Sequence, residues 1–186
     1  LAATIAEARA LADAATDLAS LEAAVRGFNG CALKKTATNT VFAQGVAASR
    51  LMFIGEAPGA DEDRAGVPFC GAGGQLLDKM LGFIGLKRDT NFYITNTLFW
   101  RPPGNRQPTV EELEICKPFV EKHIALVNPK LMVLVGGFSY FGGLDEAMDQ
   151  GTAQNISTAR RQSGKRLTYL EDMLLIGHYT EGGTQH

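Results

Sequence analysis

The sequence predicts a single α/β domain, a three-layer α/β/α sandwich around a central, mainly parallel sheet. Apolar runs of strand length alternate with segments of helical periodicity, an order typical of a parallel sheet covered on both faces. The clearest buried strand, residues 131–135, is closed by two glycines. A second apolar run, residues 51–54, leads directly into a glycine-rich loop, and strand ends of this kind bind ligands in open α/β sheets.

Length and composition agree with one globular domain. The chain has 186 residues, of which 45% are hydrophobic and 20% charged, enough to bury one substantial core. No apolar run reaches the ~20 residues that span a bilayer, so we expect no membrane partner. Three widely spaced cysteines form no disulfide framework and favour a reducing, cytoplasmic compartment. The formal net charge of −2 gives no sign of a polyanionic partner, and we expect a monomer.

The amino-terminal part predicts one helix followed by two strands. Residues 3–26 carry apolar side chains at three- to four-residue spacing, which predicts an amphipathic helix ended by Gly27 and Gly30. Residues 41–43 predict a short edge strand. Residues 51–54 predict a buried one.

The middle of the chain alternates helix, strand and helix. Residues 74–85 predict a helix with one apolar face, made of Leu76, Leu77, Met80, Leu81 and Ile84. Residues 92–96 predict a strand. Residues 100–108 contain three prolines and cannot continue as regular structure. Thr109 is a good N-cap for a helix that runs to about Leu126.

Signals weaken in the carboxy-terminal part, residues 138–186. Residues 150–164 are polar and typical of a loop, and residues 173–176 predict a last strand leading to His178. A basic run falls near this loop and consists of Arg160, Arg161, Lys165 and Arg166. Such a run is either a solvated loop or a surface that contacts phosphates.

The glycine-rich loop carries the strongest functional signal. It begins with GEAPG at residues 55–59, continues through three carboxylates at 61–63 and reaches Phe69. Glycine and proline force a sharp turn and let a ligand approach the backbone closely. Carboxylates beside one aromatic ring, at the carboxyl end of a buried strand, predict an active site.

This loop and the segments after it resemble the family 4 uracil-DNA glycosylases. After the loop, the matching segments are YITN at 93–96, WRPPGNR at 100–106 and PKL at 129–131 with its strand. The resemblance covers roughly residues 28–137. It implies a uracil-DNA glycosylase fold and hydrolysis of the N-glycosidic bond of uracil in single- or double-stranded DNA, with free uracil as product.

The resemblance also implies a uracil pocket. Phe69 is suited to stack on a flipped base, and Asn96 can offer a donor and an acceptor to the uracil edge. Gly55 and Ala57 belong to the same pocket loop, and Glu56 lines the space where a thymine methyl would have to fit. Without the resemblance, a core side chain is the likelier interpretation of Phe69, and a turn or capping residue is the alternative interpretation of Asn96.

Candidate catalytic residues follow from the same resemblance. Glu62 would position the attacking water or offset positive charge on the sugar, and Glu56 is a second carboxylate beside it. His178 follows an apolar strand, as does the family's histidine that bonds a uracil oxygen, but Tyr179 replaces the expected proline. In family 1 enzymes an aspartate at the position of Ala57 activates water. Catalysis here therefore depends on another carboxylate or on stabilisation of the leaving group.

DNA contacts are expected from two arginines of the proline-rich segment, Arg101 and Arg106, and from the basic run at 160–166. Arg101 and Arg106 could instead pair with acidic residues of the next helix, which are Glu111, Glu112 and Glu114.

Family 4 enzymes hold a four-iron cluster on four cysteines. Cys31 and Cys116 match two of those places, while Phe28 and Trp100 stand at the other two and Cys70 matches none. Cluster ligation needs thiolates at all or nearly all corners. We therefore expect no metal and no cofactor, with packed apolar volume in the cluster's place.

Other functions share the expected fold. A non-catalytic or very slow protein would hold uracil-DNA without cutting it, and a polymerase-associated interaction module would keep the fold alone. A nucleotide-binding Rossmann domain is disfavoured because no Gly-x-Gly-x-x-Gly opens a helix directly after the strand.

Overall fold

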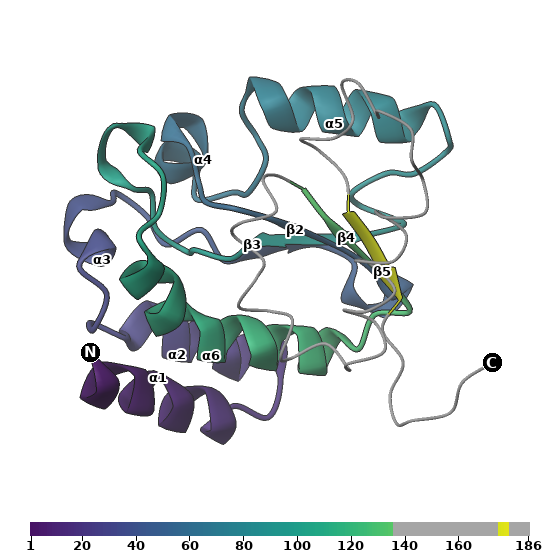
Figure 1. Ribbon diagram of the computed structural model, residues 1–186. Helices are drawn as coiled ribbons and strands as arrows, with labels where there is room; N and C mark the ends of the chain where they lie inside the picture. The colour runs from purple at the N-terminus through teal and green to yellow at the C-terminus, as the bar shows by residue number, and fades with distance from the viewer. Residues whose placement is uncertain (136–174, 179–186) are drawn as a thin grey trace, which may run out of the picture.

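The computed structural model describes residues 1–135 and the backbone of residues 175–178 (Figure 1). Its helices are α1 (Ala2–Ala14), α2 (Leu18–Gly27), α3 (Leu33–Thr36), α4 (Ala60–Ala65), α5 (Ala72–Gly82) and α6 (Val110–Val127). Its strands are β1 (Ala43–Gly45), β2 (Leu51–Gly55), β3 (Tyr93–Asn96), β4 (Leu131–Leu134) and β5 (Leu175–His178). Within this part of the chain, no helix has the length and apolarity to cross a bilayer.

The strands form one mixed sheet in the order β1-β3-β2-β4-β5. The three inner strands are parallel, and each edge strand pairs in the antiparallel sense. Gly55 at the end of β2 pairs with Asn96 at the end of β3. The carboxyl ends of the two central strands therefore meet at one edge of the sheet.

Helices cover both faces of this sheet, which gives three layers (Figure 1). Helices α1, α2 and α6 lie on one face and α5 lies on the other. Side chains alternate along each strand, so Met52 and Ile54 of β2 join the larger core cluster while Phe53 joins Leu77 and Leu81 of α5. The expected fold class, an α/β/α sandwich, is confirmed.

The helix expected over residues 3–26 is two helices, so that prediction was wrong. Asp17 starts α2 as its N-cap, with its carboxylate accepting from the Ser20 N–H at 2.7 Å and the Ser20 hydroxyl bonding back to the Asp17 N–H. This capping box satisfies donors at the start of α2, and α1 ends before it in the extended backbone of Ala15. Apolar periodicity continues across the break and hides it.

The apolar face expected on the helix at 74–85 divides in the structure. Leu77 and Leu81 of α5 are buried against the sheet, whereas Leu76 is 52% and Met80 36% exposed. Ile84 lies beyond the end of α5 and is 71% exposed. The sheet contacts only the part of the helix centred on Leu77 and Leu81.

Candidate active site

Backbone hydrogen bonds join β2 and β3 beyond their ends. The Thr97 N–H donates to the Gly55 carbonyl at 2.9 Å, and the Leu98 N–H donates to the Glu56 carbonyl at 3.0 Å. The Thr97 hydroxyl also donates to the Glu56 carbonyl at 2.7 Å. Glu56, the residue of the glycine-rich loop that follows β2, is thereby fixed against the segment after Asn96.

Two predicted site residues converge on Gly55. A Cβ built on Gly55 would lie 2.2 Å from Cζ of the Phe69 ring and 2.5 Å from Oδ1 of Asn96. Side-chain atoms do not tolerate such distances, so only glycine fits between the ring and the carboxamide. The structure thus brings Gly55, Phe69 and Asn96 together at the carboxyl edge of the sheet.

The Asn96 side chain is held in an interior strand. Asn96 is 2% exposed, and β3 has a hydrogen-bonded neighbour on each side. No residue among 1–135 donates a hydrogen bond to its carboxamide or accepts one from it. The amide therefore presents both a donor and an acceptor beside Gly55.

Phe69 has a backbone conformation that L-residues rarely adopt, with φ at 53°. Its carbonyl is packed closely, because a Cβ on Gly74 would lie 1.9 Å from the Phe69 oxygen. Arg88 also donates a hydrogen bond to that oxygen, at 2.7 Å. No sequence pattern singled out Arg88, because it reaches the loop through backbone carbonyls.

Glu62 braces the glycine-rich loop from within. Its carboxylate accepts the N–H of Gly59 at 3.1 Å and the N–H of Gly71 at 2.8 Å. These residues lie at the two ends of the segment that contains α4 and Phe69. The structure gives Glu62 a positioning task in the loop, and its contact with water or sugar stays a prediction.

The neighbouring carboxylates have separate partners. Asp61 pairs with Arg64 on the exposed surface at 3.1 Å. Asp63 is 5% exposed and accepts the N–H groups of Thr38 and Asn39, at 2.8 and 3.0 Å. Asp63 therefore anchors the segment around Thr38 and Asn39, which precedes β1.

The backbone of His178 lies far from this edge. In the antiparallel pairing of β5 with β4, His178 is opposite Leu131, which in turn pairs with Leu51. Leu51 begins β2, and Gly55 ends it. The described backbone does not bring His178 together with Gly55 and Asn96.

The two arginines of the proline-rich segment differ in their contacts. Arg106 donates to both oxygens of Glu112, at 2.9 and 2.6 Å, and this bond is the first cause that holds the pKa of Glu112 below its usual range. The Nε–H of Arg101 donates a hydrogen bond to Oδ1 of Asn105 at 2.7 Å, and its Nη groups have no acceptor within residues 1–135. The predicted contacts of Arg160, Arg161, Lys165 and Arg166 lie outside the described residues.

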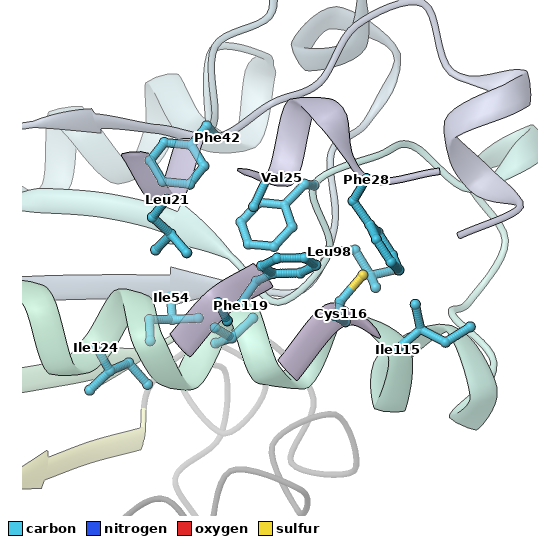
Figure 2. Packing of buried hydrophobic residues seen from close by; sticks show 14 of the residues in the cluster. Leu21, Val25, Phe28, Phe42, Ile54, Leu98, Ile115, Cys116, Phe119 and Ile124 are labelled. Carbon is cyan, nitrogen blue, oxygen red and sulfur yellow. The ribbon is translucent and has the colours of Figure 1, made fainter. Parts of the chain in front are cut away.

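The four positions of the expected cluster lie in one packed apolar core, part of which Figure 2 shows around Phe28 and Cys116. Cys31 and Cys116 share a hydrogen bond, which lowers the pKa of the Cys31 thiol; the same bond and complete burial raise the pKa of Cys116. The rings of Phe28 and Trp100 are each 1% exposed. Two thiols and two rings do not fit a four-iron cluster, which needs donors at its corners.

Comparisons with known proteins place these features in a family context. The family model described as the uracil DNA glycosylase superfamily matches residues 42–167. A protein named "Type-4 uracil-DNA glycosylase" from Archaeoglobus fulgidus is 47% identical over 109 residues, 59% of this chain and 54% of that protein. One of the same name from Sulfurisphaera tokodaii is 43% identical over 110 residues, 59% of this chain and 50% of that protein.

A more distant similarity links the chain to a phage protein. A "DNA polymerase" of Bacillus phage SP01 is 27% identical over 96 residues, which are 52% of this chain and 10% of the polymerase. The chain spans about half the length of the glycosylases it matches.

Proposed function

This chain belongs to the uracil DNA glycosylase superfamily, and from that membership we propose that it removes uracil from DNA by hydrolysing the N-glycosidic bond. The observation that carries the proposal is the convergence of Phe69 and Asn96 on Gly55. An aromatic face and an amide edge at one point are what a planar base taken out of the duplex needs.

Asn96 would stabilise the departing base. When the bond between C1′ of the sugar and N1 of uracil breaks, the base takes the electron pair and the sugar carries positive charge. Hydrogen bonds from a fixed donor strengthen as negative charge grows on the base, so they favour the transition state over the ground state. Water then supplies hydroxide to C1′ and a proton to uracil.

Glu62 would act on the sugar side of the reaction. Each Glu62 oxygen accepts one backbone N–H, and a carboxylate oxygen has two lone pairs, so an acceptor site for water remains on each. The family resemblance supports this role for Glu62 and the pocket-lining role for Glu56 and Ala57. His178 and a metal cluster have no step in the proposal.

The proposal is tested by excision from an oligonucleotide with one uracil. The expected result is strand scission at that site after heating in alkali. Intact strands together with a retarded band would overturn excision and support a uracil-DNA binder. Equal retardation of uracil-bearing and plain DNA, without scission, would overturn excision and support an interaction module that retains only the fold.

Asn96→Asp tests the base contact. We expect the rate on uracil to fall about a hundredfold or more, because the change removes a donor and puts negative charge beside an anionic leaving group. Asn29→Asp is the matched control, since Asn29 is an exposed residue far along the chain from the loop. Unchanged uracil preference in Asn96→Asp would count against this pocket.

A further inference from the structure

Arg88 belongs to the segment that connects α5 to β3, and its side chain is only 13% exposed. It donates to the carbonyls of Pro68 at 2.5 Å and Phe69 at 2.7 Å. It also donates to Gln44 at 2.8 Å. Its bonds to the two oxygens of Asp78 are 3.0 Å each from Nη2, with Nε at 3.3 Å from one of them.

Every N–H direction of the guanidinium is used by a protein acceptor. Arginine has five N–H donors in a rigid fork, and those of Arg88 serve two carbonyls, one amide and one carboxylate. Arg88 borders a surface hollow of about 590 Å³ that Gln44 and Asp78 also line. Because its donors are committed to the protein, we assign Arg88 to the loop and not to an anion in that hollow.

The loop contact of Arg88 falls at a non-glycine residue with positive φ. Phe69 is in the left-handed region, and such conformations persist where the surroundings fix them. Arg88 binds the Phe69 carbonyl, and Gly74 leaves room for that oxygen only because it has no side chain. Together they set the direction in which the phenyl ring leaves the chain.

We propose that Arg88 is a positioning residue for the base pocket, holding the Pro68 and Phe69 carbonyls so that the Phe69 ring stays over Gly55. The inference rests on the proposed function, because the ring is the group it positions for uracil. Asp78 supports this arrangement, because its carboxylate fixes the guanidinium of Arg88 and neutralises its charge. Lysine cannot replace Arg88 fully, since an ammonium group cannot span two carbonyls and a carboxylate in one plane.

A double-mutant cycle with Phe69 tests the proposal. Single-turnover excision and inhibition by free uracil are measured for Arg88→Ala, Phe69→Ala and the double variant. If Arg88 acts through the ring, Arg88→Ala lowers excision about tenfold or more in the parent and less than about twofold in the Phe69→Ala background. Inhibition by uracil weakens in the same pattern. Arg64→Ala is the matched control, because the Arg64 side chain makes only an exposed pair with Asp61.

The outcomes separate the two claims. Equal loss from Arg88→Ala in both backgrounds means a general structural role and overturns the inference, as does activity equal to that of Arg64→Ala. A parent protein that neither excises uracil nor binds free uracil overturns the proposed function, and the inference with it. Should Arg88→Ala not fold, Arg88→Lys is carried through the same cycle, with partial loss expected in the parent and none in the Phe69→Ala background.

Discussion

Gly55 is the position at which the candidate site has least room. The Phe69 ring and the Asn96 carboxamide occupy the two sides of the space where a Cβ would be. Both groups approach because the backbone presents no side chain there. The absence of a methyl group on Gly55 therefore fixes how closely the ring and the amide can face each other.

Gly55→Ala should separate these groups. Because the new methyl would meet Phe69 Cζ at 2.2 Å, the ring must move, and overpacking of this kind costs about 1–3 kcal/mol. We expect uracil inhibition and excision both to weaken by about tenfold or more, which titration with free uracil and single-turnover assays would measure.

Gly73→Ala provides the control for this prediction. Nothing lies within 4 Å of a Cβ built on Gly73, which is in α5, so alanine fits there and favours the helix. The idea that Gly55 sets the pocket fails if both alanine variants retain the parent's uracil affinity.

The start of α6 gives the two arginines of the proline-rich segment different contacts. Thr109 caps α6, with its hydroxyl accepting the Glu112 N–H at 3.2 Å, and the Glu112 carboxylate bonds back to the Thr109 N–H at 2.9 Å. Arg106 joins this capping box through Glu112. Arg101 stands outside it, bonded to Asn105.

Arg101→Ala and Arg106→Ala should therefore differ. Arg101→Ala is expected to weaken DNA binding and reduce the salt dependence by about one phosphate contact, without change in Tm. Arg106→Ala is expected to lower Tm and to leave the salt dependence nearer that of the parent, because Glu112 already neutralises Arg106. Binding titrations at several salt concentrations and thermal melts check both. The same salt slope in both variants would contradict the assignment.

Sequence patterns predicted elements best where apolar residues are continuous. Residues 51–54 and 131–135 were recognised because a fully buried strand is apolar throughout, and β2 and β4 match them closely. The break before α2 was missed because Asp17 and Ser20 interrupt no apolar spacing. The short helix α4 was missed because its support is Glu62 bonding to Gly59, a contact within a loop.

At the scale of the whole molecule, the larger core encloses a polar pair, His123 and Tyr93. His123 of α6 is fully buried, its ring stacks on Phe42 at 4.5 Å, and it shares a 2.7 Å hydrogen bond with the Tyr93 hydroxyl. Its Nδ1 has no partner in the described part of the chain. Burial lowers the pKa of His123 to about 3, so the ring is neutral at neutral pH.

Acid should unfold the protein partly through His123. In the unfolded chain its pKa is about 6.5, so below that pH the unfolded state binds a proton that the folded state excludes. Stability is unaffected by His123 above pH 6.5 and falls toward pH 3, by up to about 1.4 kcal/mol per pH unit. Denaturant unfolding at several pH values measures this slope.

His123→Gln isolates the contribution. Glutamine retains a polar group for Tyr93 but does not titrate, so the variant should lose stability less steeply between pH 6.5 and 4 than the parent does. Parallel pH profiles for the two proteins would show that other groups govern acid unfolding.

Residue patterns alone predict neither the strand order nor the contacts that bring the site side chains together; only the family resemblance placed Gly55, Phe69 and Asn96 in one pocket. Gly55 and Asn96 each mark a strand end in the sequence, but their pairing depends on β3 lying beside β2. Phe69 reaches them from a loop whose path depends on Arg88 and Gly74. Those contacts involve backbone carbonyls, which are the same for every residue type, so no pattern of side chains announces them.

Asn96 and Phe69 are held in place by different parts of the molecule. The amide is set in an interior strand, where a change disturbs neighbours on both sides, while the ring comes from a segment tied down at a few points. Substitutions confined to the loop would therefore reshape the pocket. The sheet beneath would stay the same, so the strand end and the loop can be varied independently.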